Sequence, residues 1–379
     1  ADADAPLMET GIDSLGAVEL RNQLQHASGA ESLPSTLVFD HPTARSLASA
    51  LQPVRAAGTV VASLPSARVS IGSGASIDGC SALLPAGASS SAMASRVAAC
   101  GCDMVVEVPA TRWDVHALPV QSEAIASRMR HTGFVHGAEL ADPTAFSVSS
   151  AEAAAMDPCQ RLLLERGYEA LHGAALLREA LSGSLTGVFL GFAGTEFGSM
   201  LSATPAGGSV YAATGSSASI AVGRLSYALG LHGPCVSYDT ACSAALSACH
   251  AALRSLQLAE CTAGLVVGVG LILTPIISSS FAVAGMTSTR GRSHTFDARA
   301  DGYARAEACG GIALRPGDEC GRLSLQGSAV RQDGRSASLT APNGQAQQGL
   351  LVAALSDAGT SADALVVHEA HGTGTALGD

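Results

Sequence analysis

The feature that most constrains the fold is an alternation, from Val69 onward, between short apolar runs and alanine-rich segments. The runs that we predict as strands are Thr186–Gly191, Cys235–Asp239, Leu265–Ile272, Ile312–Leu314, Leu323–Val330 and Ala364–Glu369. The segments that we predict as helices are Ala151–Gly173, Ser217–Leu229, Cys242–Leu258 and Ala346–Ala358. Strands that alternate with helices are typical of an α/β domain with buried sheets.

The first part of the chain has a different character, because it is acidic and its apolar residues recur at helical spacing. Asp13 or Ser14 can cap a helix that runs to about His26, and Thr43 can cap a last helix. Pro53 and Pro65 lie in a stretch that is typical of a linker. The sequence therefore predicts a helical unit over residues 1–52, a linker over 53–67 and an α/β domain over 68–379.

Composition excludes several functions. With 47% hydrophobic and 14% charged residues among 379, the chain can bury a large core. The net charge of −11 argues against nucleic-acid binding, which needs a basic face. All 21 basic residues are arginine, which excludes a Schiff-base lysine and a phosphate-loop lysine in this stretch. The longest apolar run, Ala263–Ile277, contains Pro275 and three glycines and is too short to span a membrane.

The ten cysteines contain no Cys-x-x-Cys pair, so neither a structural metal site nor a redox pair is indicated. Dispersed cysteines of this kind are typical of reduced, intracellular proteins. We expect an intracellular location. The cytoplasm is the expected compartment, and an organelle is the alternative.

The segment Tyr238-Asp239-Thr240-Ala241-Cys242-Ser243-Ala244-Ala245-Leu246 places a thiol where a predicted strand turns into a helix. A helix N-terminus points free N–H groups toward the sulfur, which favours the reactive thiolate. The small neighbours leave room for an acyl chain and for close helix packing. A buried structural role fits Cys249, further along the same helix, better than it fits Cys242.

The segment Val366-Val367-His368-Glu369-Ala370-His371-Gly372-Thr373-Gly374-Thr375 places an imidazole after a predicted strand, before two glycines that are each followed by threonine. A thiol and an imidazole are the groups needed to hold and transfer an acyl group as a thioester.

Together the two segments resemble the active site of a β-ketoacyl synthase, the condensing enzyme of polyketide and fatty-acid synthases. The resemblance implies a thiolase-like α/β fold with two sheets layered between helices, and a homodimer. It implies that Cys242 accepts the acyl chain and that His371 stabilises the enolate formed from a malonyl-type unit. It also implies that Thr373 and Thr375 position the pantetheine arm.

The chain departs from the family pattern in three places. Ala244 and Ala245 stand where serines are usual after the cysteine, and Ala306 and Ala308 flank Glu307 in place of glycines. The family's second histidine and the glycine-rich loop of its oxyanion hole are not found. We expect Asp297, Arg305 and Glu307 to form a structural ion-pair network.

The segments Leu7–Leu15 and Phe39–Thr43 resemble an acyl carrier protein. The resemblance implies that Ser14 carries a 4′-phosphopantetheine arm, attached by a phosphopantetheinyl transferase, and that the acidic helix docks on partner enzymes. The family's first helix is not found. We therefore interpret the chain as a fragment of a modular polyketide synthase, with a truncated all-α carrier bundle followed by an incomplete thiolase-like domain.

The implied function is decarboxylative Claisen condensation of an acyl chain with a carrier-bound malonyl-type extender. The partners are acyl and malonyl-type thioesters on carrier domains. The alternative is a non-elongating acyl-transfer or scaffold module whose carrier domain does the useful work. A thiol hydrolase using Cys242 and His371 is less consistent with the sequence, because no orienting carboxylate is identified and a carrier lies beside it.

Overall fold

The structure is a computed structural model that describes Ala3, Leu7, Ile12 and residues 14–28, 32–51, 74–118, 122–194, 196–317, 323–375 and 378–379. Asp13 and the predicted linker over 53–67 lie outside the described residues. The chain divides into two compact units. The first unit is Ala1–Ser70, Ala329–His368 and Leu377–Asp379, and the second unit is Ile71–Ser328 and Glu369–Ala376.

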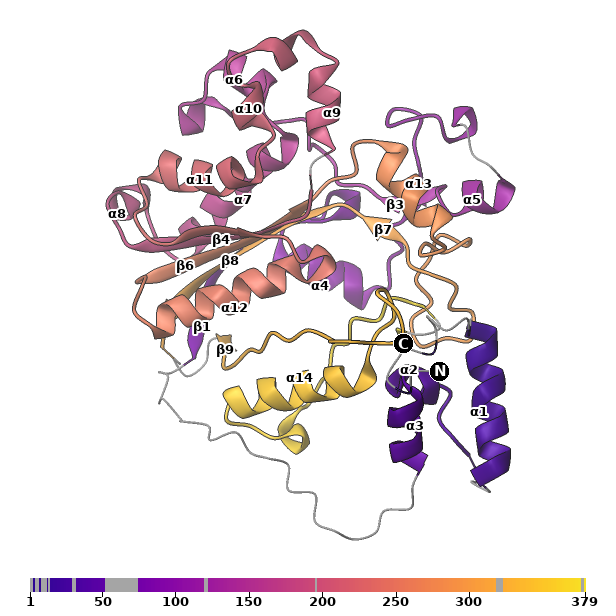
Figure 1. The fold of residues 1–379 in the computed structure, drawn as a ribbon. Helices are drawn as coiled ribbons and strands as arrows, with labels where there is room; N and C mark the ends of the chain where they lie inside the picture. Colours follow the sequence, from indigo (N-terminus) through magenta and orange to yellow (C-terminus); the bar gives the residue numbers. More distant parts are fainter. Residues whose placement is uncertain are drawn as a thin grey trace. The chain divides into compact units, whose positions relative to one another are not determined.

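A six-stranded mixed sheet forms the centre of the second unit (Figure 1). Its strands, in spatial order, are β5 (Cys235–Tyr238), β4 (Thr186–Phe192), β6 (Ala263–Gly270), β8 (Ala308–Pro316), β1 (Ala75–Leu83) and β9 (Ser324–Leu325). β4 is parallel to both β5 and β6, whereas the remaining pairs are antiparallel. The carboxyl ends of β4, β5 and β6 therefore share one edge of the sheet.

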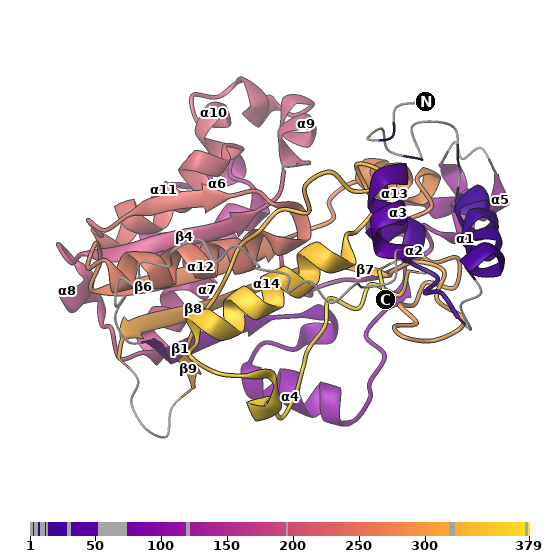
Figure 2. The same cartoon turned by 60° about the horizontal axis from the view of Figure 1, so that its bottom comes forward.

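Helices cover both faces of this sheet. α7 (Pro158–Gly173) and α11 (Ala218–Leu229) lie on one face and α12 (Ala244–Gln257) lies on the other (Figures 1 and 2). Strand β4 shows the period-two pattern that this arrangement requires, because Val188 and Leu190 pack with α7 and α11 while Phe189 packs with α12. The expected α/β domain with a buried sheet is confirmed.

Glycines bring α12 unusually close to the sheet. A Cβ atom at Gly191 would lie 2.4 Å from the Ala245 nitrogen, and one at Gly268 would lie 3.0 Å from the Ala245 Cβ. Two adjacent strands thus present no side chain to the first turn of α12, which lies against their backbones. This close approach fixes the start of the helix that follows Cys242.

The remainder of the second unit surrounds this core. A small sheet contains β2 (Val106–Glu107), β3 (His131–Gly133) and β7 (Arg305–Ala306). The shorter helices are α4 (Ser91–Ala99), α5 (Glu123–Ser127), α6 (Ser150–Ala154), α8 (Arg178–Leu181), α9 (Phe197–Ser202), α10 (Ala212–Gly215) and α13 (Pro275–Val283). Single 3₁₀ turns lie at Pro85–Gly87, Val115–Ala117, Thr144–Phe146, Pro205–Gly208 and Ala241–Ser243.

The first unit is helical. It contains α1 (Ser14–Ser28), α2 (Leu37–Asp40), α3 (Ala44–Leu51), α14 (Gly344–Asp357) and a 3₁₀ turn at Ala362–Ala364. Thr43 caps α3 as predicted, because the Ser46 N–H donates to Thr43 Oγ1 at 3.1 Å. No helix among the described residues is long and apolar enough to cross a membrane.

Three predictions of elements were wrong. The helix predicted over Ala151–Gly173 is two helices, because the Asp157 carboxylate accepts the Cys159 N–H at 2.7 Å and Pro158 begins α7. The strand predicted over Leu323–Val330 is limited to Ser324–Leu325. The strand predicted over Ala364–Glu369 is absent, because no strand of the described residues pairs with it, and Val366 stays 96% exposed.

Candidate active site

Cys242 lies in a tight turn at the carboxyl edge of the sheet. Strand β5 ends at Tyr238, a 3₁₀ turn covers Ala241–Ser243, and α12 begins only at Ala244. The predicted helix start at Cys242 is thus two residues early. Ala241 has a φ of 51°, in the left-handed region that non-glycine residues rarely adopt. A strained residue between strand and helix presents the next side chain outward, and Cys242 is exposed.

Hydrogen bonds inside the turn hold it in shape. Asp239 Oδ1 accepts the Ala241 N–H at 3.2 Å, and the Thr240 carbonyl accepts the Ser243 N–H at 3.2 Å. Ser243 Oγ also donates to the Thr240 carbonyl at 2.9 Å. Ala244 is 5% exposed and packs where the family usually has serine. The small residues predicted around the cysteine therefore permit the close packing of α12, as expected.

His371 lies in an extended loop of the same unit as Cys242. The Thr295 hydroxyl donates to the Gly372 carbonyl at 2.7 Å, and the Gly302 N–H donates to the Gly374 carbonyl at 2.9 Å. Gly372 and Gly374 have φ values of 56° and 70°, which explains why glycine occupies both positions. The two glycines of the motif thus anchor the loop, while the His371 side chain stays exposed.

The loop Asp301-Gly302-Tyr303 contacts the segment that contains His371. Gly302 binds the histidine loop at Gly374. Burial raises the pKa of the neighbouring Tyr303 phenol, and the charge of Arg305 opposes this shift. Among the described residues, no hydrogen bond joins Cys242 to His371 directly.

The other predicted site residues are placed as follows. The hydroxyl groups of Thr373 and Thr375 form a hydrogen bond with each other at 3.0 Å, so one of the two hydroxyl hydrogens is already donated within the pair. Ser14 opens α1 in the first unit. The N-terminus of a helix of this length attracts a phosphate group, which is compatible with a phosphopantetheine arm at that position.

The expected ion-pair network of Asp297, Arg305 and Glu307 is wrong, because each residue has different partners. Glu307 is fully buried and receives a bidentate pair from Arg112 at 3.0 and 2.9 Å. Asp297 pairs with Arg299 at 2.8 Å. Glu307 also accepts the backbone N–H groups of Val135 and Ile272, so it joins three separate segments beside the site.

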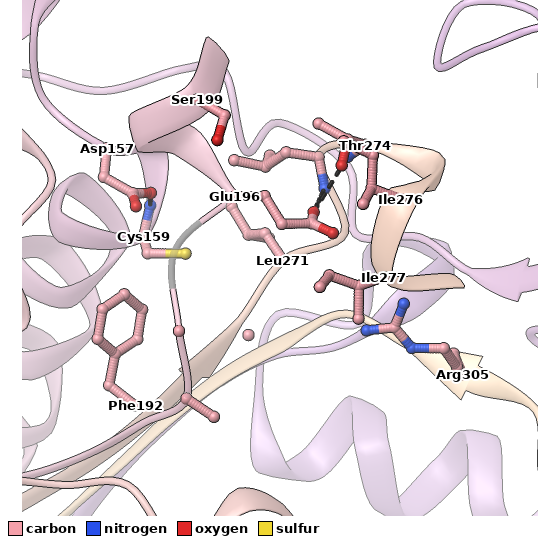
Figure 3. A pocket seen from close by; sticks show the side chains of 14 residues that line it. Asp157, Cys159, Phe192, Glu196, Ser199, Leu271, Thr274, Ile276, Ile277 and Arg305 are labelled. Atoms are coloured by element: carbon pink, nitrogen blue, oxygen red, sulfur yellow. Dashed lines mark hydrogen bonds between the residues drawn. The ribbon is translucent and has the colours of Figure 1, made fainter. Parts of the chain in front are cut away.

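Sequence reasoning missed a cavity of about 250 Å³ in the second unit (Figure 3). Its apolar lining includes Phe192, Leu271 and Ile277, and its polar lining includes Glu196 and Arg305. These residues come from β4, α13, β7 and the connecting loops. No local pattern marks them, since they lie on separate elements that only the tertiary packing brings together.

Family models match most of the chain. "Beta-ketoacyl synthase, N-terminal domain" matches residues 55–319 and "Beta-ketoacyl synthase, C-terminal domain" matches residues 323–379. "Phosphopantetheine attachment site" matches residues 1–51. The chain belongs to the β-ketoacyl synthase family, preceded by a phosphopantetheine carrier region. The resemblance inferred from the two motifs and from the carrier segments is confirmed.

The similar curated proteins are modular polyketide synthases. The chain is 41% identical to polyketide synthase GfsB of Streptomyces halstedii over 98% of its length, and 42% identical to mycoketide-CoA synthase of Mycobacterium tuberculosis over 100%. It is 40% identical to the pikromycin polyketide synthase component PikAII of Streptomyces venezuelae. The chain spans only 7%, 9% and 10% of these relatives.

Solved ketosynthase structures share the fold. The ketosynthase from module 6 of the bacillaene synthase of Bacillus subtilis 168 matches with a TM-score of 0.73 at 30% identity, over 80% of this chain and 52% of that one. The oxazolomycin ketosynthase domain OzmH KS7 of Streptomyces albus JA3453 matches with a TM-score of 0.72 at 31% identity, over 81% and 55%. The expected thiolase-like α/β fold is confirmed.

Proposed function

We propose that this chain supplies the ketosynthase part of a polyketide synthase and lengthens acyl chains by decarboxylative Claisen condensation. The observation that supports this best is the strained turn that presents Cys242 in front of α12. The proposed organisation is a carrier region over residues 1–52, a linker over 53–67 and a synthase domain over 68–379.

In the first step, Cys242 Sγ attacks the carbonyl carbon of an acyl thioester. A new C–S bond forms, the bond to the carrier sulfur breaks, and the carrier thiol leaves with the proton. The backbone N–H of Cys242 is proposed to stabilise the oxyanion of this step.

In the second step, a malonyl-type thioester loses CO₂ and its carbon attacks the acyl group on Cys242. A C–C bond forms, the C–S bond to Cys242 breaks, and the thiolate is restored with a chain longer by two carbons. The proposed role of His371 is to donate a hydrogen bond to the extender carbonyl, where negative charge develops as CO₂ leaves. The proposed role of Thr373 and Thr375 is to position the pantetheine arm by hydrogen bonds.

Ser14 is the proposed attachment residue of 4′-phosphopantetheine, which supplies a thiol for acyl chains when attached. The partners proposed are acyl and malonyl-type thioesters on carrier domains, and a phosphopantetheinyl transferase that loads Ser14. An intracellular location is proposed on the supply of these thioesters. The nine described cysteines are all free, which supports it.

A homodimer through the synthase domain is also proposed. Strand β5 is the last strand of the described sheet on its side, so its outer edge is unpaired there. Val236 on this strand is 41% exposed, and Leu246 on the adjoining α12 is 74% exposed. An unpaired edge beside exposed apolar side chains is suited to pairing with a second copy.

The comparisons do not favour the scaffold alternative, since the match extends through both the cysteine and the histidine segments. The test is intact-mass spectrometry of the full-length protein after incubation with an acyl thioester, in parallel with Cys242→Ala. We expect an acyl adduct that the substitution abolishes. Ser14→Ala serves as a matched control that should lose the phosphopantetheine mass and keep the adduct on Cys242.

A folded protein that forms no adduct would overturn the condensing-enzyme proposal. An adduct that persists in Cys242→Ala would assign the acyl acceptor to another residue.

A further inference from the structure

We propose that Glu196 selects acyl chains that carry a hydroxyl group, by accepting a hydrogen bond inside the cavity beside the active site. The inference rests on the proposed function, because it assigns part of the substrate of that same site. It goes further by naming the residue and the chemical group that it recognises.

The cavity is lined by elements that meet at the carboxyl edge of the sheet. Phe192 ends β4, Leu271 follows β6, and Ile277 belongs to α13 (Figure 3). These side chains give a largely apolar wall. A volume of about 250 Å³ is slightly below the usual range for drug-sized ligands, so the space suits a short acyl chain better than a large molecule.

Glu196 uses only half of its hydrogen-bonding capacity. Its Oε2 accepts the backbone N–H groups of Leu273 at 2.6 Å and Thr274 at 3.0 Å, at the N-terminus of α13. Its Oε1 is buried and makes no hydrogen bond within the described part of the chain. The carboxylate is therefore fixed in orientation by one oxygen while the other has no protein donor.

A second buried polar atom lines the same cavity without a partner. Thr274 Oγ1 makes no hydrogen bond to any described residue. Arg305 also lines the cavity, but its guanidinium donates to Ser278 Oγ at 2.8 Å and stacks 5.0 Å from the centre of the Phe281 ring. The charges of Arg305 and Glu196 attract each other, but no described cation lies within ion-pair distance of Glu196. The Oε1 atom therefore has no donor among the described residues and is free to accept one from a ligand in the cavity.

The chemistry of these two atoms defines the ligand. An ionised carboxylate can only accept hydrogen bonds, whereas a threonine hydroxyl can donate and accept. A hydroxyl group on an acyl chain can donate to Glu196 Oε1. A ketone at the same carbon offers only lone pairs and would leave the buried carboxylate oxygen unsatisfied. The cavity is thus suited to a hydroxyacyl chain and unsuited to its ketone.

The cavity and the acyl-accepting thiol belong to the same edge of the sheet. The carboxyl ends of β4, β5 and β6 share one edge, from which both the cavity and the Cys242 turn begin. A chain attached to Cys242 and directed along this edge would meet the cavity.

The test compares 3- and 5-hydroxyacyl N-acetylcysteamine thioesters with the ketoacyl thioesters of the same length. The full-length protein is incubated with each, and the rate constant for acylation of Cys242 is measured by intact-mass spectrometry. We expect at least one hydroxyacyl chain to react about tenfold faster than its ketone, as a hydrogen bond to a charged group implies.

Glu196→Gln is the decisive variant. Its amide oxygen can still accept the Leu273 and Thr274 N–H groups, while its NH₂ group replaces an acceptor in the cavity with a donor. The preference for the hydroxyl over the ketone should narrow to about twofold or invert. Thr274→Val removes only the second polar atom, Thr274 Oγ1. This variant should weaken the preference for the hydroxyl over the ketone without inverting it. It also keeps the test informative if Glu196→Gln does not fold.

The outcomes separate the two proposals. If no thioester acylates Cys242 in folded protein, the proposed function is wrong. If all thioesters react and the hydroxyl-to-ketone ratio is the same in wild type and Glu196→Gln, the condensing enzyme stands and the role of Glu196 is refuted.

Discussion

Replacing Gly191 by alanine tests whether the close approach of α12 to the sheet positions Cys242. In the wild-type structure, a Cβ atom at position 191 would lie 2.4 Å from the nitrogen and 2.6 Å from the Cα atom of Ala245. These are backbone atoms of the first turn of α12, so no side-chain rotation can relieve the collision. Since ordinary contacts begin near 3.4 Å, the helix start must move by about 1 Å.

This displacement should lower both the unfolding free energy and the acylation rate of Cys242. Overpacking of this kind costs about 1–3 kcal/mol of unfolding free energy. For a domain of this size that lowers the unfolding temperature by about 2–12 °C. A 1 Å error in the position of a reacting group can cost about a hundredfold in rate. We therefore expect Gly191→Ala to fold with reduced stability and to acylate Cys242 far more slowly than wild type.

The assay is thermal unfolding by circular dichroism together with acylation of Cys242 followed by mass spectrometry. Gly223→Ala is the matched control, because a Cβ atom there meets nothing within 4 Å and lies inside α11. That substitution should keep the acylation rate and add up to about 1 kcal/mol of helix propensity. Equal unfolding temperatures and equal acylation rates in the two variants would refute the reasoning.

Three further predictions concern buried groups. Glu307→Ala should lower the unfolding free energy by about 3–5 kcal/mol, because it leaves the Arg112 guanidinium without its carboxylate partner and two backbone N–H groups without an acceptor. Glu123→Ala, which breaks an exposed ion pair, should cost under about 1 kcal/mol. Equal losses of unfolding free energy in urea would contradict this prediction. Burial raises the pKa of Cys261 to about 11 and of Cys309 to about 12. Iodoacetamide at pH 8 should therefore modify the exposed thiols and spare these two until the protein unfolds, as peptide mapping would reveal. Because the pKa values of these two thiols in the folded protein exceed the ordinary value near 9, the unfolding free energy should fall as the pH rises from about 9 toward 12. An unfolding free energy that stays constant over that range would contradict the inference that burial raises these two pKa values.

The helices and strands that the sequence predicted well are those with a strong local signal. The strand before Cys242 and the helix after it are predicted from the sequence because the short run Cys235–Tyr238 ends at a cluster of small residues. The break at Asp157 was also readable, since an aspartate before a proline is a start signal for a helix.

The errors at the other end of the domain have a different cause. Val366 and Val367 have high strand propensity, yet they form no strand because a strand needs a neighbour, and propensity does not supply one. Residues 326–330 likewise form no strand, because the pairing of β9 with β1 ends at Leu325. Strand length is decided by the length of the partner, which no local sequence contains.

The sequence by itself determined the chemistry of the candidate site, because the residues around Cys242, His371 and Ser14 form contiguous motifs. Only the tertiary structure decided which groups surround that chemistry. It paired Glu307 with Arg112, 195 residues away along the chain. It also directed one oxygen of Glu196 into a cavity beyond the carboxyl ends of strands β4 and β6. Contacts of this kind depend on which strands, helices and loops pack side by side in the folded chain, and no short stretch of sequence specifies that packing.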